Sequence, residues 1–371
     1  MDIRNLTLTR IACTIVLFAL VGGVLGGCAG AGRPTTQLTT FVHTTVLLES
    51  QTQVTAGAPT LGPVTTIAGG FSEALLSVNA DVPADAGVVA EIRVGQAEDD
   101  FWSPWMPIVA WGAAVGPAED SAMSFGAADD ARAGKMEIDT FVGHDAGGFD
   151  RVQHRFRSVT PEGKAVVVKR VAICTTRETG EKTWGDVVSA NTPPKTAKLT
   201  GLRLRTMDVP FRSQFTERPE LAGRLCSPTS VSMVLAYRGK PTDVLDVANC
   251  AFDASQEIYG NWPRNVQAAY VMGVPGYLTR VSNWGEVERY VARGTPLVIS
   301  IRVKPGELPA APYSDTDGHL IVLTGFAANG DVTVNDPAVR EPDKGRRVYP
   351  RADLERVWMS NTAGTTYVLG E

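Results

Sequence analysis

Cys226 stands at a position that favours a reactive thiol. Pro228 suits the first turn of a helix, because that turn does not need the missing amide hydrogen. Apolar residues then recur at helical spacing, at Val231, Val234 and Leu235. A thiol at a helix start lies near unpaired amides and the positive end of the helix dipole, which stabilise the thiolate. The alternative is a buried structural cysteine, which is the usual state of a free cysteine.

His319 and Asp336 could supply the base and the carboxylate that such a thiol requires. His319 begins one apolar segment and Asp336 ends the next, with the turn residues Asn329-Gly330 between them. If the two segments pair as a hairpin, the imidazole and the carboxylate fall at the same end. A carboxylate holds an imidazole in one tautomer and stabilises its protonated form. Taken singly, each has a structural explanation: a core histidine, and a turn former before Pro337.

Gln214 is the candidate donor to a developing oxyanion. It ends an extended segment that begins near Met207, and its side-chain amide could act together with the backbone amide of Cys226. One donor of this kind typically contributes about a hundredfold to a thousandfold in rate. A single glutamine carries no specific signal, so this role depends on the other three residues.

The elements that must position these groups follow from hydrophobic periodicity. After Cys226, helical patterns cover 243–251, 264–272 and 284–291, and strand patterns cover 296–301, 319–326 and 331–335. Helices therefore precede the sheet, which is typical of an α+β fold.

The preceding region reads as an all-β domain. Apolar and alternating segments at 40–48, 74–78, 88–94, 136–142, 152–157 and 165–173 are separated by glycine- and proline-bearing turns. Many short strands of this kind predict an antiparallel sandwich. Trp102, Trp105 and Trp111 are expected to cap its core, and the alternative is a surface for a sugar or a peptide.

The N-terminus has the order of a secretory leader. Arg4 and Arg10 precede an apolar run from 11 to 25, and the sequence Leu25-Gly26-Gly27-Cys28 follows. This resembles the bacterial lipoprotein box, which implies cleavage before Cys28, lipid attachment to that cysteine and an extracytoplasmic position on the cell membrane. Cleavage after Ala29 or Ala31, giving a free secreted protein, is the alternative.

The order Gln214, Cys226, His319, Asp336 resembles the papain-like cysteine peptidases. The motifs 209–214, 226–230, 318–325 and 334–337 are closest to the bacteriocin-processing, double-glycine peptidase family and its secreted relatives. The resemblance implies Cys226 as nucleophile, His319 as general base, Asp336 as orienting acid and Gln214 as oxyanion donor.

The same resemblance indicates where a substrate groove would lie. Ser227 replaces the glycine that is common after the family's cysteine, so the groove shape is expected to differ. Trp262 and Trp284 are candidates for its walls, with core packing as the alternative for both tryptophans.

The predicted organisation has five parts. They are a lipoprotein signal peptide at 1–27, a tether at 28–36, a β-sandwich at 37–188, a linker at 189–200 and a papain-like cysteine peptidase domain at 201–371. The linker follows from Pro193-Pro194 in a polar stretch.

The leading functional hypothesis is a lipid-anchored cysteine peptidase acting on peptide, protein or cell-wall peptide. The alternatives are a cell-wall amidase or transpeptidase that uses the same thioester, and an inactive binding module. A net charge of −5 over 371 residues argues against a nucleic-acid partner. The scattered cysteines, histidines and aspartates show no metal-ligand spacing, so neither a metal nor another cofactor is expected.

Overall fold

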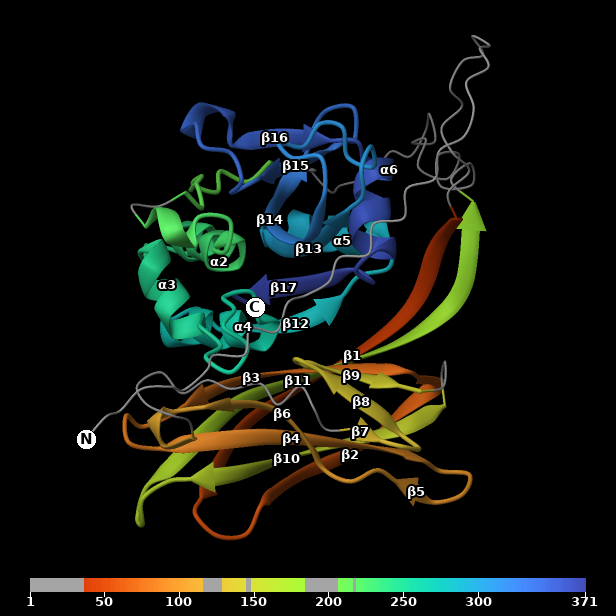
Figure 1. Cartoon of the computed structure of the whole chain (residues 1–371), viewed down its shortest axis with the longest axis vertical. Helices are drawn as coiled ribbons and strands as arrows, with labels where there is room; N and C mark the ends of the chain where they lie inside the picture. The colour runs from red at the N-terminus through yellow and green to blue at the C-terminus, as the bar shows by residue number, and fades with distance from the viewer. Residues whose placement is uncertain (1–36, 116–128, 145–147, 184–205, 216–217) are drawn as a thin grey trace, which may run out of the picture. The chain divides into compact units, whose positions relative to one another are not determined.

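The computed structural model describes residues 37–115, 129–144, 148–183, 206–215 and 218–371. The leader with Cys28, the tether and the linker at 189–200 lie outside these residues. The described chain is mostly β-sheet with a few helices, arranged as a β domain up to Thr183 and a second domain from Thr206 (Figure 1).

Two antiparallel sheets make up the described part of the β domain. The first has the order β1 (Gln37–Thr55), β11 (Ala165–Thr183), β3 (Glu73–Asp81), β9 (Thr140–Gly143), β8 (Gly134–Glu137) and β7 (Asp129–Asp130). The second has the order β2 (Thr60–Phe71), β10 (Phe149–Val159), β4 (Gly87–Gln96) and β5 (Phe101–Trp102), and β6 (Met106–Trp111) also pairs with β4. A short 3₁₀ turn, η1 (Ala113–Val115), follows β6.

The two sheets share one apolar core. Leu76 and Ile173 come from the first sheet and Ile92 and Phe156 from the second, and all four are buried in the same cluster. Burying the inward side chains of two stacked sheets is the arrangement of a sandwich. The sequence prediction of an antiparallel β domain therefore agrees with the structure.

The segment 136–142 was expected to form one strand, and that expectation is wrong. Met136 pairs with Phe141 across a tight turn, so β8 and β9 form a hairpin. Ile138 adopts a positive φ of 58°, a conformation that a β-branched residue seldom takes. The turn leaves Asp139 at the tip of the hairpin.

The three tryptophans of this domain occupy different environments. Trp111 is buried in the sandwich core, as expected. Trp102 and Trp105 are half-buried instead, and the Arg93 guanidinium lies 4.3 and 4.7 Å from their ring centroids. The prediction of core capping therefore holds for Trp111 alone, because arginine side chains rather than core residues cover the other two rings.

The second domain combines helices with an antiparallel sheet whose strands differ in length. The sheet order is β12 (Gly276–Arg280), β17 (Thr365–Leu369), β13 (Leu297–Val303), β14 (Thr316–Phe326), β15 (Val332–Asn335) and β16 (Arg346–Tyr349). The helices are α2 (Cys226–Tyr237), α3 (Val244–Ala251), α4 (Trp262–Val271), α5 (Trp284–Ala292) and α6 (Arg351–Leu354), which continues into the π-helical η4 (Glu355–Ser360). Two 3₁₀ turns are η2 (Pro219–Leu221) and η3 (Pro342–Lys344).

Local sequence explains where several helices begin. Asp243, Asn261 and Asn283 each precede a helix and accept a backbone N–H from its first turn through the side chain. Such caps satisfy amide groups that a helix start leaves unpaired. Helix α2 packs on β14, and Ser230 Oγ donates to the Leu320 carbonyl at 3.0 Å. The helix that begins with Cys226 is therefore fixed against the strand that carries His319.

The β domain and the second domain meet along β3 and β12, within a single compact unit of residues 36–371. Asn79 Oδ1 accepts from the Gly276 amide at 3.0 Å, and Ser77 Oγ accepts from the Leu278 amide at 2.9 Å. Gln267 bonds both polar backbone groups of Ala80. In the described ranges, no helix combines the length and apolar character needed to cross a bilayer.

Candidate active site

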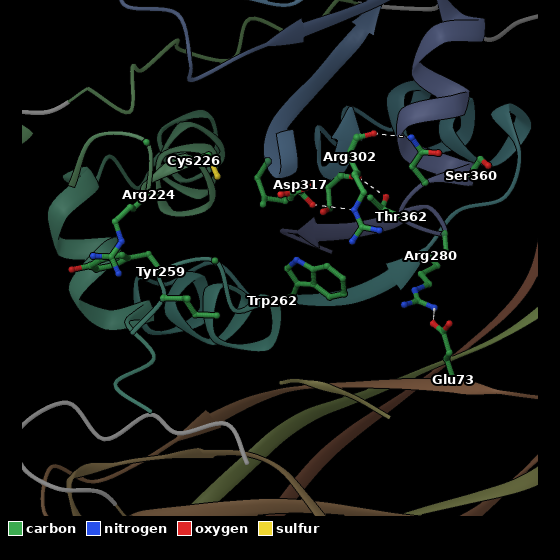
Figure 2. A pocket seen from close by; sticks show the side chains of 18 of the residues that line it. Glu73, Arg224, Cys226, Tyr259, Trp262, Arg280, Arg302, Asp317, Ser360 and Thr362 are labelled. Atoms are coloured by element: carbon green, nitrogen blue, oxygen red, sulfur yellow. Dashed lines mark hydrogen bonds and ion pairs between the residues drawn. The ribbon is translucent and has the colours of Figure 1, made fainter. Parts of the chain in front are cut away.

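Cys226 is the first residue of α2 and its side chain is half-buried. The Leu225 carbonyl before it accepts the Thr229 amide at 2.9 Å, which closes the first turn. Cys226 lines a cavity of about 510 Å³, and its sulfur points into that space (Figure 2). The thiol is therefore open to a ligand while its backbone is fixed by the helix.

His319 and Asp336 are brought together by the β14–β15 hairpin. Val322 pairs with Asn335, so His319, three residues before Val322, and Asp336, directly after Asn335, lie at the same end of the hairpin. His319 Nε2 donates to Asp336 Oδ1 at 2.8 Å, and both side chains are buried. Because the carboxylate occupies Nε2, Nδ1 is the ring nitrogen left for Cys226, and the two groups shift each other's pKa.

The Asp336 carboxylate is fixed by further donors. Tyr349 donates its hydroxyl to Oδ2 at 2.7 Å and Tyr313 donates to the same oxygen at 3.0 Å. The Ala338 amide donates to Oδ1 at 3.0 Å. The Tyr313 ring also meets the His319 ring edge-on, with centroids 5.1 Å apart. This network satisfies a carboxylate that burial would otherwise destabilise.

Electrostatics in this cluster favour the ion pair of thiolate and imidazolium. Burial raises the pKa of the Cys226 thiol, but the hydrogen bond and charge of His319 and the nearby amides outweigh it, so the pKa is lowered. Burial lowers the pKa of His319, and the charge and hydrogen bond of Asp336 outweigh it, raising this pKa to about 10. Burial likewise raises the pKa of Asp336, but its contact with His319 leaves it below the ordinary value.

Gln214 lies beside the Asp336 end of the cluster. Its backbone amide donates to the Pro337 carbonyl at 2.9 Å, and its side chain is buried. The Oε1 atom has no hydrogen-bond partner among the described residues. Within the same residues, no hydrogen bond joins Gln214 to Cys226.

The cavity around Cys226 has both aromatic and charged walls. Trp262, at the start of α4, lines it, as do Arg280 from β12 and Arg302 from β13 (Figure 2). Arg302 Nε donates to the Asp317 carbonyl at 3.1 Å. The cavity can therefore hold an extended chain with both apolar and polar side chains.

Two residues expected in the groove lie elsewhere, which corrects the prediction for both. Trp284 is in the core, where its ring meets Trp358 edge-on and its indole N–H donates to Glu355. Ser227 is fully buried, and its hydroxyl lies 2.9 Å from the Tyr367 hydroxyl. Ser227 points away from the cavity because consecutive side chains on an α-helix are rotated by about 100° around the helix axis.

Sequence reasoning missed the residues that support the site. Tyr313 and Tyr349 do not belong to any recognisable sequence motif. The local pattern around Tyr349, which precedes Pro350, indicates only a strand. Cys174 and Cys250 lie outside the cavity. In the part of the chain that the structure describes, no group of three His, Cys, Asp or Glu side chains is arranged to hold a metal ion.

Comparison with known proteins gives separate matches for two parts of the chain. Residues 206–365 match the family described as Peptidase_C39 like family, and residues 28–176 match one described as Peptidase C39 N-terminal domain. No curated protein matches the sequence. A solved structure titled "Crystal structure of a double glycine motif protease from AMS/PCAT transporter in complex with the leader peptide" shares 23% identity, with a TM-score of 0.31. That match covers 45% of this chain and 94% of the other. The second domain is thus similar to a C39-like peptidase, and the β domain is similar to the N-terminal domain found with such peptidases.

Proposed function

We propose that this protein is a cysteine peptidase with a papain-like arrangement of Cys226, His319 and Asp336. The observation that carries the proposal is the His319 ring hydrogen-bonded to the Asp336 carboxylate, together with a Cys226 thiol that lines an open cavity and whose pKa is lowered by His319. The match of residues 206–365 to a C39-like peptidase family supports it. Three such groups in series form the usual arrangement for activating a nucleophile.

In this mechanism the Cys226 thiolate attacks the carbonyl carbon of a peptide bond. The C–S bond forms as the carbonyl π pair moves to oxygen, and the oxyanion takes a hydrogen bond from the Cys226 amide and the Gln214 side chain. The C–N bond then breaks while His319 gives its proton to the leaving amine. A thioester remains on Cys226, and His319 is neutral.

Water completes the cycle. His319 takes a proton from a water molecule while the water oxygen attacks the thioester carbon. The C–S bond then breaks and releases the carboxylic acid product and the Cys226 thiolate. Asp336 stabilises the imidazolium whenever His319 is protonated, because its carboxylate stays charged beside the ring. No bound group beyond the chain is required.

We further propose that the protein acts outside the cytoplasm, attached to the membrane by lipid on Cys28. The basic, then apolar, then small-residue order before Cys28 supports this position. More than one acyl chain would be needed for firm attachment, since a single chain binds only marginally.

The test is hydrolysis of a peptide library by the purified protein, with cleavage sites located by mass spectrometry. Wild type is expected to cut internal peptide bonds, and Cys226→Ala and His319→Ala to lose at least about a thousandfold in kcat. Cys250→Ser, which changes a half-buried thiol outside the cavity, serves as the matched control. Equal hydrolysis by wild type and Cys226→Ala would overturn the proposal. Transfer of the acyl group to an added amine, without hydrolysis, would reassign the protein as a transpeptidase.

A further inference from the structure

The cavity that contains Cys226 has walls from both domains. Phe41 on β1 and Glu73 on β3 line it, and the remaining lining residues lie between 223 and 363. Phe41 and Glu73 are both half-buried, so each presents part of its side chain to the cavity. A ligand that fills the space beside the thiol therefore comes within reach of the β domain.

Glu73 controls the charge of this end of the cavity through Arg280. Its carboxylate accepts from Arg280 Nη1 at 2.5 Å, as Figure 2 shows, and the Arg280 side chain is only 5% exposed. The same guanidinium donates to Thr176 Oγ1 at 2.8 Å and to Thr365 Oγ1 at 3.3 Å. Arg280 Nη2 makes no hydrogen bond to any described residue. One guanidinium edge is thus neutralised by Glu73 and another remains for a ligand.

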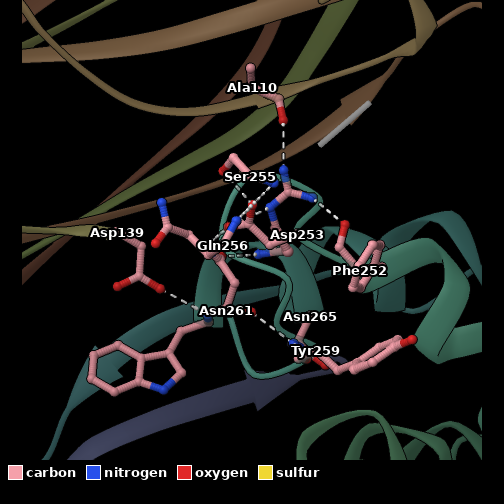
Figure 3. A network of polar contacts seen from close by, with 11 residues as sticks. Ala110, Asp139, Phe252, Asp253, Ser255, Gln256, Tyr259, Asn261 and Asn265 are labelled. Atoms are coloured by element: carbon pink, nitrogen blue, oxygen red, sulfur yellow. Dashed lines mark hydrogen bonds and ion pairs between the residues drawn. The ribbon is translucent and has the colours of Figure 1, made fainter. Parts of the chain in front are cut away.

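The β domain also fixes the aromatic wall. Asp139, at the tip of the β8–β9 hairpin, accepts the Trp262 amide at 2.9 Å. The Ala110 carbonyl accepts from the buried Arg264, which lies 3.6 Å from Asp253 (Figure 3). These contacts position the first turn of α4, the turn from which Trp262 faces the cavity.

We propose that the β domain is part of the substrate-binding site, and that Glu73 determines which substrate side chain is accepted beside Phe41 and Arg280. This inference rests on the peptidase function proposed above. Because Glu73 neutralises Arg280, the end of the cavity beside these two residues gives an acidic side chain little advantage over its neutral isostere. The β domain then selects substrates in addition to packing against the peptidase domain.

Replacing Glu73 by Gln changes charge and keeps shape. Arg280 then faces the cavity as an uncompensated cation, so the rate of reaction with a substrate that carries Glu should rise relative to the rate with one that carries Gln. For a partly exposed pair the expected gain in selectivity is about fivefold. Phe41→Ala removes apolar contact area and should lower kcat/KM by about tenfold with kcat nearly unchanged.

The experiment uses the complete chain and peptidyl acyloxymethyl ketones, which alkylate an active-site cysteine without turnover. The probes differ at one position, carrying Glu, Gln, Lys or Leu, and mass spectrometry follows their rate of reaction at Cys226. Glu49→Gln is the matched control for Glu73→Gln, since Glu49 pairs with Arg170 on β11 away from the cavity. Val42→Ala is the control for Phe41→Ala, because Val42 is the next residue on β1 and does not line the cavity.

The expected result is a Glu-to-Gln rate ratio that rises about fivefold in Glu73→Gln and stays at the wild-type value in Glu49→Gln. Thermal unfolding of each variant excludes a general loss of structure. An unchanged ratio in Glu73→Gln, together with an unchanged rate in Phe41→Ala, would overturn the inference and leave the peptidase proposal intact. Failure of the peptidase proposal can be told apart from this result, because the peptide-library assay and the Cys226→Ala variant test that proposal independently.

Discussion

His319 Nε2 and Asp336 Oδ1 lie 2.8 Å apart, although 17 positions separate the residues in the chain. The distance follows from one hairpin, in which β14 carries the histidine and the aspartate directly follows β15. Since Nε2 is engaged by the carboxylate, the ring directs Nδ1 to Cys226. The hairpin therefore sets both the tautomer and the direction of the base.

Asp336→Asn should reduce kcat while leaving KM nearly unchanged. Asparagine preserves the shape but removes the charge that stabilises the imidazolium, so we expect kcat to fall by about a hundredfold to ten-thousandfold. Steady-state kinetics on a library-derived peptide measures this. Asp343→Asn, at an exposed position in η3, is the control. A kcat within twofold of wild type in Asp336→Asn would contradict the role of this carboxylate.

Tyr349→Phe should destabilise the fold. The Tyr349 hydroxyl is buried and donates to the Asp336 carboxylate at 2.7 Å, so its removal leaves a charged oxygen short of a donor. We expect the free energy of unfolding to fall by about 1–3 kcal/mol, as measured in urea. Tyr237→Phe is the comparison, because that hydroxyl donates to the neutral Gly294 carbonyl at 3.3 Å. Equal losses in the two variants would show that the charge of the acceptor is unimportant.

The sequence was most informative where contacts are local. The turn at Asn329-Gly330 predicts the β14–β15 hairpin, and helical spacing predicts that α2 begins near Cys226. Contacts between distant segments were not predictable in this way. Trp284 packs against Trp358, 74 positions later, and nothing in either local pattern distinguishes that core contact from a groove wall. Glu73 enters the cavity only because the β domain packs on β12.

Asp139 should make the free energy of unfolding depend on pH in a mildly acidic range. Burial raises its pKa to about 6, so the folded protein binds a proton that the unfolded chain releases near pH 4. The contribution of Asp139 to the free energy of unfolding is therefore greatest at low pH. It declines by up to about 3 kcal/mol as pH rises from about 4 to about 6. Urea unfolding of wild type and Asp139→Asn across this range measures the difference. Parallel curves for the two proteins would contradict the raised pKa.

Cys28→Ser should abolish lipid attachment. The lipoprotein box predicts that this cysteine carries the lipid, so cells given an alkyne-bearing fatty acid should label wild type and leave Cys28→Ser unlabelled. Cys13→Ser is the matched control, since Cys13 lies within the apolar run of the proposed leader. Persistent labelling of Cys28→Ser, or none in wild type, would remove the proposed anchor.

The most direct test of the central claim is the pH dependence of Cys226 alkylation by iodoacetamide, compared between wild type and His319→Ala. The lowered pKa of Cys226 and the raised pKa of His319, about 10, predict a thiolate–imidazolium pair across neutral pH. Wild type should therefore react rapidly well below the ordinary thiol pKa of about 8.5. In His319→Ala, the pH at which alkylation of Cys226 begins should rise to about 8.5 or above. The same onset near pH 8.5 in both proteins would contradict the claim that His319 activates Cys226.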